Sequence, residues 1–144
     1  YANEIQQLEM QLEGRLDNVI GTLSGGQRQS ITLLMAVMNK PKVLLLDEHT
    51  AALDPKTAAQ ILKLTQKFIE QNQLTAIMVT HSMQQALSLG NRTIMMNKGE
   101  IIADLDAEAK RTLTVQDLLN RFADLRKEEQ LTDEMLIKLQ NEYL

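Results

Sequence analysis

The segment Ser24–Gln27 combines two glycines with two residues that can cap the start of a helix. Ser24 and Gln27 have the spacing of a capping box, in which each side chain hydrogen-bonds the backbone N–H of the other residue. A capping box does not account for Gly25 and Gly26, each of which costs up to about 1 kcal/mol relative to Ala in a helix. Glycines let a bulky anion approach the backbone, and a helix N-terminus offers N–H donors and a positive dipole end. These residues therefore predict an anion site suited to phosphate.

Two carboxylates and a histidine follow apolar runs further along the chain. Asp47 and Glu48 close the run Val43–Leu46, and His81 comes after a second run, residues 74–79. Short continuous apolar runs indicate strands buried on both faces of a parallel sheet. Ligands of open parallel sheets gather at the carboxyl ends of the strands. We therefore expect the three side chains to converge at one edge of such a sheet.

Helical periodicity predicts the elements that hold these residues. Residues 25–39 indicate a largely buried helix that ends before Pro41, and Asp54 followed by Pro55 gives the N-cap and first position of another helix. A further helical stripe is predicted within residues 4–20, with apolar positions at Ile5, Leu8, Leu12, Leu16 and Val19.

The second half of the chain shows capping and turn signals. Ser82 and Gln85 form a capping-box pattern that opens a short helix, and Lys98-Gly99 separates two strand-like segments as a β-hairpin. Two terminal amphipathic helices are expected after caps at Thr114 and Thr132. The order of elements argues for an α/β fold with a mostly parallel sheet, a C-terminal β-hairpin and terminal helices.

Composition excludes several classes of function. The 144 residues are about one domain long, contain no cysteine and have no apolar run long enough to cross a bilayer. Residues 1–103 contain nine acidic and nine basic residues, so the whole net charge of −4 comes from residues 104–144. With no basic stripe and only 3% aromatic residues, nucleic acid is not an expected partner.

Four motifs together resemble the ATP-binding-cassette (ABC) ATPases. Leu23-Ser24-Gly25-Gly26-Gln27 matches the signature pentapeptide of that family, and the following Arg28-Gln29 extends the match to its transporter form. Leu44–Glu48 resembles the Walker B motif with its catalytic glutamate. Ala52-Leu53-Asp54 resembles the D-loop, and His81 matches the switch histidine. The resemblance covers most of residues 23–104.

The resemblance implies a role for each matching residue. Asp47 would hold Mg²⁺ through its hydration shell, and Glu48 would orient or deprotonate the water that attacks ATP. His81 would bond the γ-phosphate, and Asp54 would lie at the seam between two ATPase subunits. The signature would bind a nucleotide held on the other subunit through Leu23, Ser24, Gly25, Gly26 and Gln27. The implied cofactors are therefore ATP and Mg²⁺.

The sequence departs from the family pattern in two places. His49 stands where the family usually has proline, and a hydrogen-bonded histidine is the expected interpretation rather than a metal ligand. Nothing matches Gly-x-x-x-x-Gly-Lys-Ser/Thr, the loop that cradles the phosphates. We therefore expect the C-terminal piece of a partial P-loop NTPase-like three-layer fold, which by itself neither binds ATP at micromolar concentration nor hydrolyses it.

This interpretation carries further expectations. Residues 1–39 would form part of a helical subdomain, residues 40–104 the C-terminal part of the ATPase core, and residues 105–144 a helical tail. The edge of the Val43–Leu46 strand would be open and would promote self-association.

The resemblance implies an ATPase subunit that couples hydrolysis to solute transport, most like a bacterial importer of a small organic solute. Its partners would be a second ATPase subunit, as a homodimer, and transmembrane permease subunits, at the cytoplasmic face of the membrane. The C-terminal lobe of a chromosome-maintenance (SMC-type) ATPase is the alternative, since such lobes also lack the phosphate loop. Gln27-Arg28-Gln29 and His81-Ser82 favour the transporter. A noncatalytic paralogue is disfavoured because Asp47, Glu48 and His81 are all present.

Overall fold

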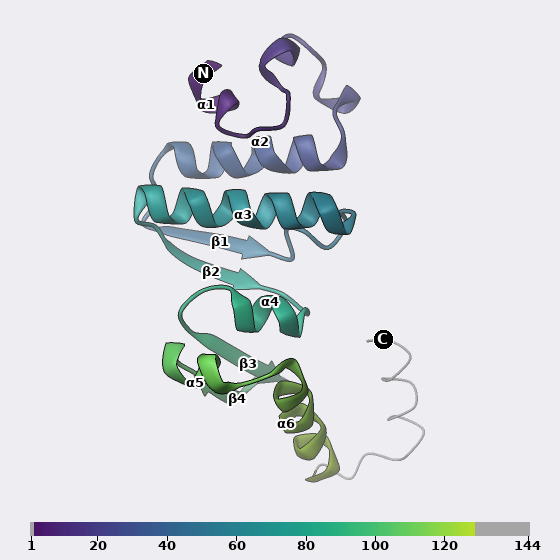
Figure 1. The fold of residues 1–144 in the computed structure, drawn as a ribbon, viewed down its shortest axis with the longest axis vertical. Coiled ribbons are helices and arrows are strands. Elements are labelled where there is room, and N and C mark those ends of the chain that lie inside the picture. Colours follow the sequence, from purple (N-terminus) through teal and green to yellow (C-terminus); the bar gives the residue numbers. More distant parts are fainter. Residues whose placement is uncertain (1, 129–144) are drawn as a thin grey trace. The chain divides into compact units, whose positions relative to one another are not determined.

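The computed structural model describes residues 2–128, which fall into two compact units divided between Val79 and Thr80. Each unit is described by itself. The first contains two 3₁₀ turns besides the elements labelled in Figure 1, namely α1 (Ala2–Gln6), α2 (Gly25–Met38), β1 (Val43–Asp47), α3 (Pro55–Asn72) and β2 (Thr75–Val79). The second contains α4 (Met83–Ser88), β3 (Thr93–Asn97), β4 (Glu100–Leu105), α5 (Ala107–Thr112) and α6 (Val115–Glu128).

The predicted helix over residues 4–20 is wrong for most of its length. Helix α1 ends at Gln6, and Glu9 and Gln11 have φ angles of 53° and 55°, which a right-handed helix does not contain. The irregular path turns Leu8 and Leu12 into the core, where they are 1% and 3% exposed. Burial of two leucines outweighs the local helical pattern. The remaining stripe residues, Leu16 and Val19, are 51% and 74% exposed.

Strands β1 and β2 pair in parallel, from Val43 opposite Thr75 to Asp47 opposite Val79. This pairing confirms the predicted parallel sheet, with α3 as the connection between its strands. Helices α2 and α3 run side by side in Figure 1 and share the main buried cluster of this unit. Among the described residues the expected burial of β1 on both faces is wrong, because Leu44 and Leu46 are buried whereas Leu45 is 71% exposed. The covering helices reach only the face that carries Leu44 and Leu46.

The second unit is built around the predicted hairpin, in which β3 and β4 pair antiparallel. Lys98 and Gly99 both have positive φ, 48° and 85°, as a two-residue type I′ turn requires. A small core joins the hairpin to the helices through Met95, Leu105 and Leu118.

The terminal elements differ in part from the predictions. Helix α5, capped by Asp106, was not foreseen, whereas the Thr114 cap of α6 is confirmed by its hydrogen bonds with Asp117. The helix expected after Thr132 lies outside the described residues. None of the described helices is long and apolar enough to span a membrane. The division into segments 1–39, 40–104 and 105–144 stays a prediction.

Candidate functional site

The start of α2 has the predicted capping box. Ser24 Oγ accepts a 3.2 Å hydrogen bond from the Gln27 backbone, and Gln27 Oε1 accepts a 3.1 Å bond from the Ser24 backbone. Gln27 also donates from Nε2 to the Met10 carbonyl at 3.1 Å, which ties the irregular segment before α2 to the helix start. The helix itself supplies no acceptor for the N–H groups of Gly25 and Gly26, because they belong to its first turn. These two donors can therefore serve an anion.

Close packing gives Gly26 a second reason to be glycine. A Cβ on Gly26 would lie 2.3 Å from Cγ2 of Thr57, in the first turn of α3, so no larger residue fits there without movement. A Cβ on Gly25 would meet only the Leu53 side chain at 3.4 Å, an ordinary contact. Packing therefore explains the glycine at position 26, and only the glycine at position 25 still requires the approach of an anion as its explanation. The same contacts bring the signature segment against the D-loop segment, within one unit.

Asp47 ends β1 and Glu48 directly follows it, and both side chains are exposed. Glu48 adopts the left-handed region with φ of 42°, a strained conformation for a residue with a Cβ that costs about 1–3 kcal/mol. Its N–H donates to the Val79 carbonyl at 3.0 Å, and its carbonyl accepts from Ala51 at 3.0 Å. The backbone at the expected catalytic carboxylate is thus fixed on both sides. Strain of this kind often marks functional sites.

His49 turns back toward α3. Its Nε2 lies 3.1 Å from Thr65 Oγ1, and the Thr65 hydroxyl donates to the Ile61 carbonyl at 2.8 Å. Burial lowers the pKa of His49, because desolvation disfavours the charged imidazolium. The interpretation of His49 as a hydrogen-bonded neighbour is confirmed, and it gives this segment a donor that proline lacks.

The described residues contain no group of three or more His, Cys, Asp or Glu side chains that could hold a metal ion. Mg²⁺ differs from most metals in keeping several waters and taking only one or two carboxylates together with substrate phosphates. One exposed carboxylate at the end of β1, that of Asp47, fits this mode of binding.

Asp54 caps α3, as its sequence position predicts. Its Oδ1 accepts from the Thr57 backbone at 3.0 Å. Hydrogen bonds from the Thr57 side chain and backbone hold the pKa of Asp54 below its usual value. Capping accounts for the aspartate by itself, so its role at a subunit seam stays a prediction.

His81 belongs to the second unit and follows the end of β2 by two residues, with an exposed side chain. Thr80 Oγ1 donates to Gln85 Oε1 at 2.9 Å and accepts from the Ser82 backbone at 3.1 Å. Ser82 Oγ in turn accepts from the Gln85 backbone at 3.3 Å, which confirms the Ser82 cap. The reciprocal half of the predicted capping box is wrong, because the Ser82 N–H and Gln85 Oε1 both bond Thr80 Oγ1 instead. These bonds fix the chain on both sides of His81. Its convergence with Asp47 and Glu48 stays a prediction.

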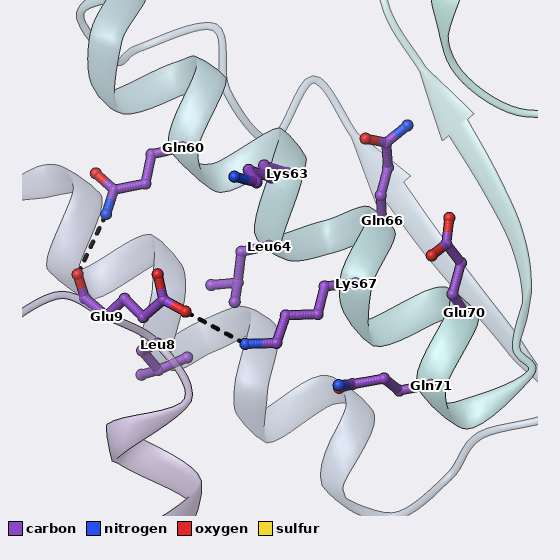
Figure 2. A pocket seen from close by; sticks show the side chains of 9 residues that line it. All are labelled: Leu8, Glu9, Gln60, Lys63, Leu64, Gln66, Lys67, Glu70 and Gln71. Carbon is purple, nitrogen blue, oxygen red and sulfur yellow. Dashed lines mark hydrogen bonds and ion pairs between the residues drawn. The ribbon is translucent and has the colours of Figure 1, made fainter.

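A groove of about 420 Å³ lies away from the candidate residues, between α3 and the irregular segment after α1. Figure 2 shows Glu9 between Gln60 and Lys67. Gln60 donates to the Glu9 carbonyl at 3.2 Å, and Lys67 pairs with the Glu9 carboxylate at 3.5 Å. The groove lining combines polar side chains with the buried leucines Leu8 and Leu64, and its contacts hold the segment that contains Leu8.

Several positioning residues were missed by sequence reasoning. Thr57 and Thr65 are helix residues whose contacts come from other elements, so no local signal marks them. Thr80 and Gln85 could have been found, because a Thr and a Gln around a Ser cap are close enough in sequence to bond one another.

A family model described as ABC transporter matches residues 2–51. The chain is 46% identical over 118 residues to the tyrosine transport ATP-binding protein of Clostridioides difficile (strain R20291), covering 82% of this chain and 47% of the relative. It is 40% identical over 138 residues to the methionine import ATP-binding protein MetN of Lactococcus lactis subsp. cremoris (strain NZ9000), covering 85% of this chain and 38% of the relative.

A solved structure of an ABC transporter in an inward-facing conformation matches the fold with a TM-score of 0.67 and 29% identity. The match covers 83% of this chain and 47% of that one. It confirms the α/β class with a parallel sheet. The chain spans less than half the length of these relatives.

Proposed function

The chain belongs to the ABC transporter family, and we propose that it forms part of the ATPase subunit of a bacterial importer of a small organic solute. The observation that carries the proposal is the close approach of the signature segment, at Gly25 and Gly26, to Leu53 of the D-loop segment and to Thr57 just after it. Two of the four motifs that resemble the family thus lie against each other within the first unit, which supports a shared role. Relatives named for tyrosine transport and methionine import favour an amino acid as the solute.

Each candidate residue has a defined task in this proposal. The first-turn N–H groups of α2 and the Ser24 hydroxyl would bind the phosphates of ATP held by a second subunit. Asp47 would hold Mg²⁺ through water, and the ion would neutralise charge between the β- and γ-phosphates. Glu48 would orient or deprotonate the attacking water, and His81 would bond the γ-phosphate. The glycine–lysine loop that cradles the phosphates has no match in residues 1–144.

The proposed partners follow from the half-site. A signature that completes a partner's nucleotide site requires a second ATPase subunit, with Asp54 at the seam. The ATPase subunits would lie at the cytoplasmic face of the membrane, and their closure would drive transmembrane permease subunits. The SMC-type alternative is not favoured, because the relatives reported above are transport proteins.

The test replaces the expected base in the protein at its natural length. In Glu48→Gln we expect ATP binding to persist while turnover falls by about 100-fold or more, since positioned acid–base groups contribute that much. Glu70→Gln is the matched control, because Glu70 is exposed on α3 away from the candidate residues. Phosphate release measures turnover, and a fluorescent ATP analogue measures binding. Undiminished turnover in Glu48→Gln would remove the assignment of the base.

A further inference from the structure

One buried hydrogen bond joins the segment after β1 to the middle of α3. Thr65 is 3% exposed, and its only hydroxyl proton is used in the 2.8 Å bond to the Ile61 carbonyl. The oxygen of that hydroxyl is therefore the acceptor toward His49, and Nε2–H of the imidazole is the donor over 3.1 Å. His49 thus has a defined direction, from the strand end into α3.

The residue directly before His49 is the strained one. Glu48 keeps φ of 42° although its Cβ disfavours that region, so its surroundings must hold it there. Bonds to Val79 and from Ala51 hold its backbone. The first bond links the Glu48 N–H to the end of β2, and the second closes the turn after β1 at the Glu48 carbonyl. The bond from His49, in contrast, reaches a buried residue of α3, Thr65.

From this arrangement we propose that His49 is a positioning residue, which ties the chain to Thr65 and so holds Glu48 in the conformation that directs its carboxylate. The proposal rests on the function proposed above for Glu48. Without the tie, Glu48 could relax to negative φ, and its side chain would leave the backbone in a different direction. His49 itself takes no part in the chemistry.

The test uses paired variants of the protein at its natural length. His49→Ala and Thr65→Val each remove one end of the bond, whereas His49→Gln and Thr65→Ser keep a donor or an acceptor. We expect kcat to fall about tenfold or more in the first pair, because small misplacements of catalytic groups cost up to about 100-fold. KM for ATP and the rates of the second pair should stay within about twofold of wild type, as expected when only positioning is lost.

Two further variants sharpen the test. The double variant His49→Ala/Thr65→Val should be no slower than either single variant, because both remove the same bond. Thr32→Val is the matched control, since Thr32 makes the same kind of helical bond, to the Arg28 carbonyl at 3.0 Å, with an exposed side chain. Circular dichroism checks folding, and Thr65→Val carries the test if His49→Ala does not fold.

A spectroscopic readout is independent of turnover. The ¹³Cα and ¹³Cβ shifts of Glu48 report its φ region, and we expect them to change in His49→Ala and to persist in His49→Gln. Unchanged Glu48 shifts, or unchanged kcat in both His49→Ala and Thr65→Val, would overturn the inference alone. A wild-type protein that binds ATP but does not hydrolyse it would instead overturn the proposed function, and the catalytic part of the inference with it.

Discussion

After β1 the chain from Glu48 to Asp54 combines local turn bonds with two bonds to residues distant in sequence, whereas after β2 the bonds that Thr80, Ser82 and Gln85 make with one another are all local. In the first segment Glu48 bonds Val79, which is 31 residues away, and His49 bonds Thr65, which is 16 residues away. The second makes a local set of three bonds that spans six residues. Two segments that begin alike, each with an ionisable side chain after a parallel strand, are therefore built by different means.

This difference teaches how each segment should respond to change. A locally held segment loses only its own bonds when one side chain is removed. A segment held by distant elements depends on how those elements pack, so a change in α2 or α3 should reach it. Substitutions in the packing layer should therefore have larger effects than substitutions in the local set.

The largest effect is expected from Gly26→Ala. The new Cβ would lie 2.3 Å from Cγ2 of Thr57, and overpacking of this kind costs about 1–3 kcal/mol. Urea unfolding of the protein at its natural length measures the loss. Gly25→Ala is the control and should be nearly neutral, because its Cβ meets Leu53 only at 3.4 Å.

A second variant tests the cause assigned to Gly26. Gly26→Ala/Thr57→Ser should recover most of the lost stability, because serine lacks Cγ2 but keeps the hydroxyl that bonds Asp54. If the double variant is as unstable as Gly26→Ala, steric contact with Thr57 is not the reason for the glycine.

A smaller effect is expected in the local segment. Thr80→Val removes the bonds to Gln85 and from Ser82, and each bond contributes about 0.5–1.5 kcal/mol. Amide hydrogen exchange at Ser82 should speed up while the Glu48–Asp54 amides are unchanged. Gln84→Ala is the control, since Gln84 is exposed beside Gln85. Faster exchange in both segments would contradict the statement that the Thr80 bonds act only locally.

The smallest effect concerns pH and Asp54. Because the folded-state pKa of Asp54 is below its ordinary value, the stability it contributes is present above about pH 3.9 and is lost as the pH falls through the lower folded value. Asp54→Asn keeps a capping oxygen without titrating, so its stability should change less over this acid range. The effect is small because Asp54 is exposed. Equal acid dependence in both proteins would contradict the assignment.

The sequence predicted much of this arrangement wherever the signals were local. Ser24 and Gln27, Asp54 and Pro55, and Lys98-Gly99 act within four residues, and the structure shows the caps and the turn that they predict. The prediction failed where burial competed with periodicity, as at Leu8 and Leu12, which a helix over residues 4–20 would have placed on one stripe.

The amino-acid sequence by itself determined the motifs, the capped helices, the strand order and the family, because all of these depend on residue types at short spacing. Only the tertiary structure decided that Thr57 leaves no room for a Cβ at Gly26, that His49 bonds Thr65, and that Glu48 is held at positive φ. Each of these depends on two elements that meet in space, and a linear pattern of residues does not encode the distance between them.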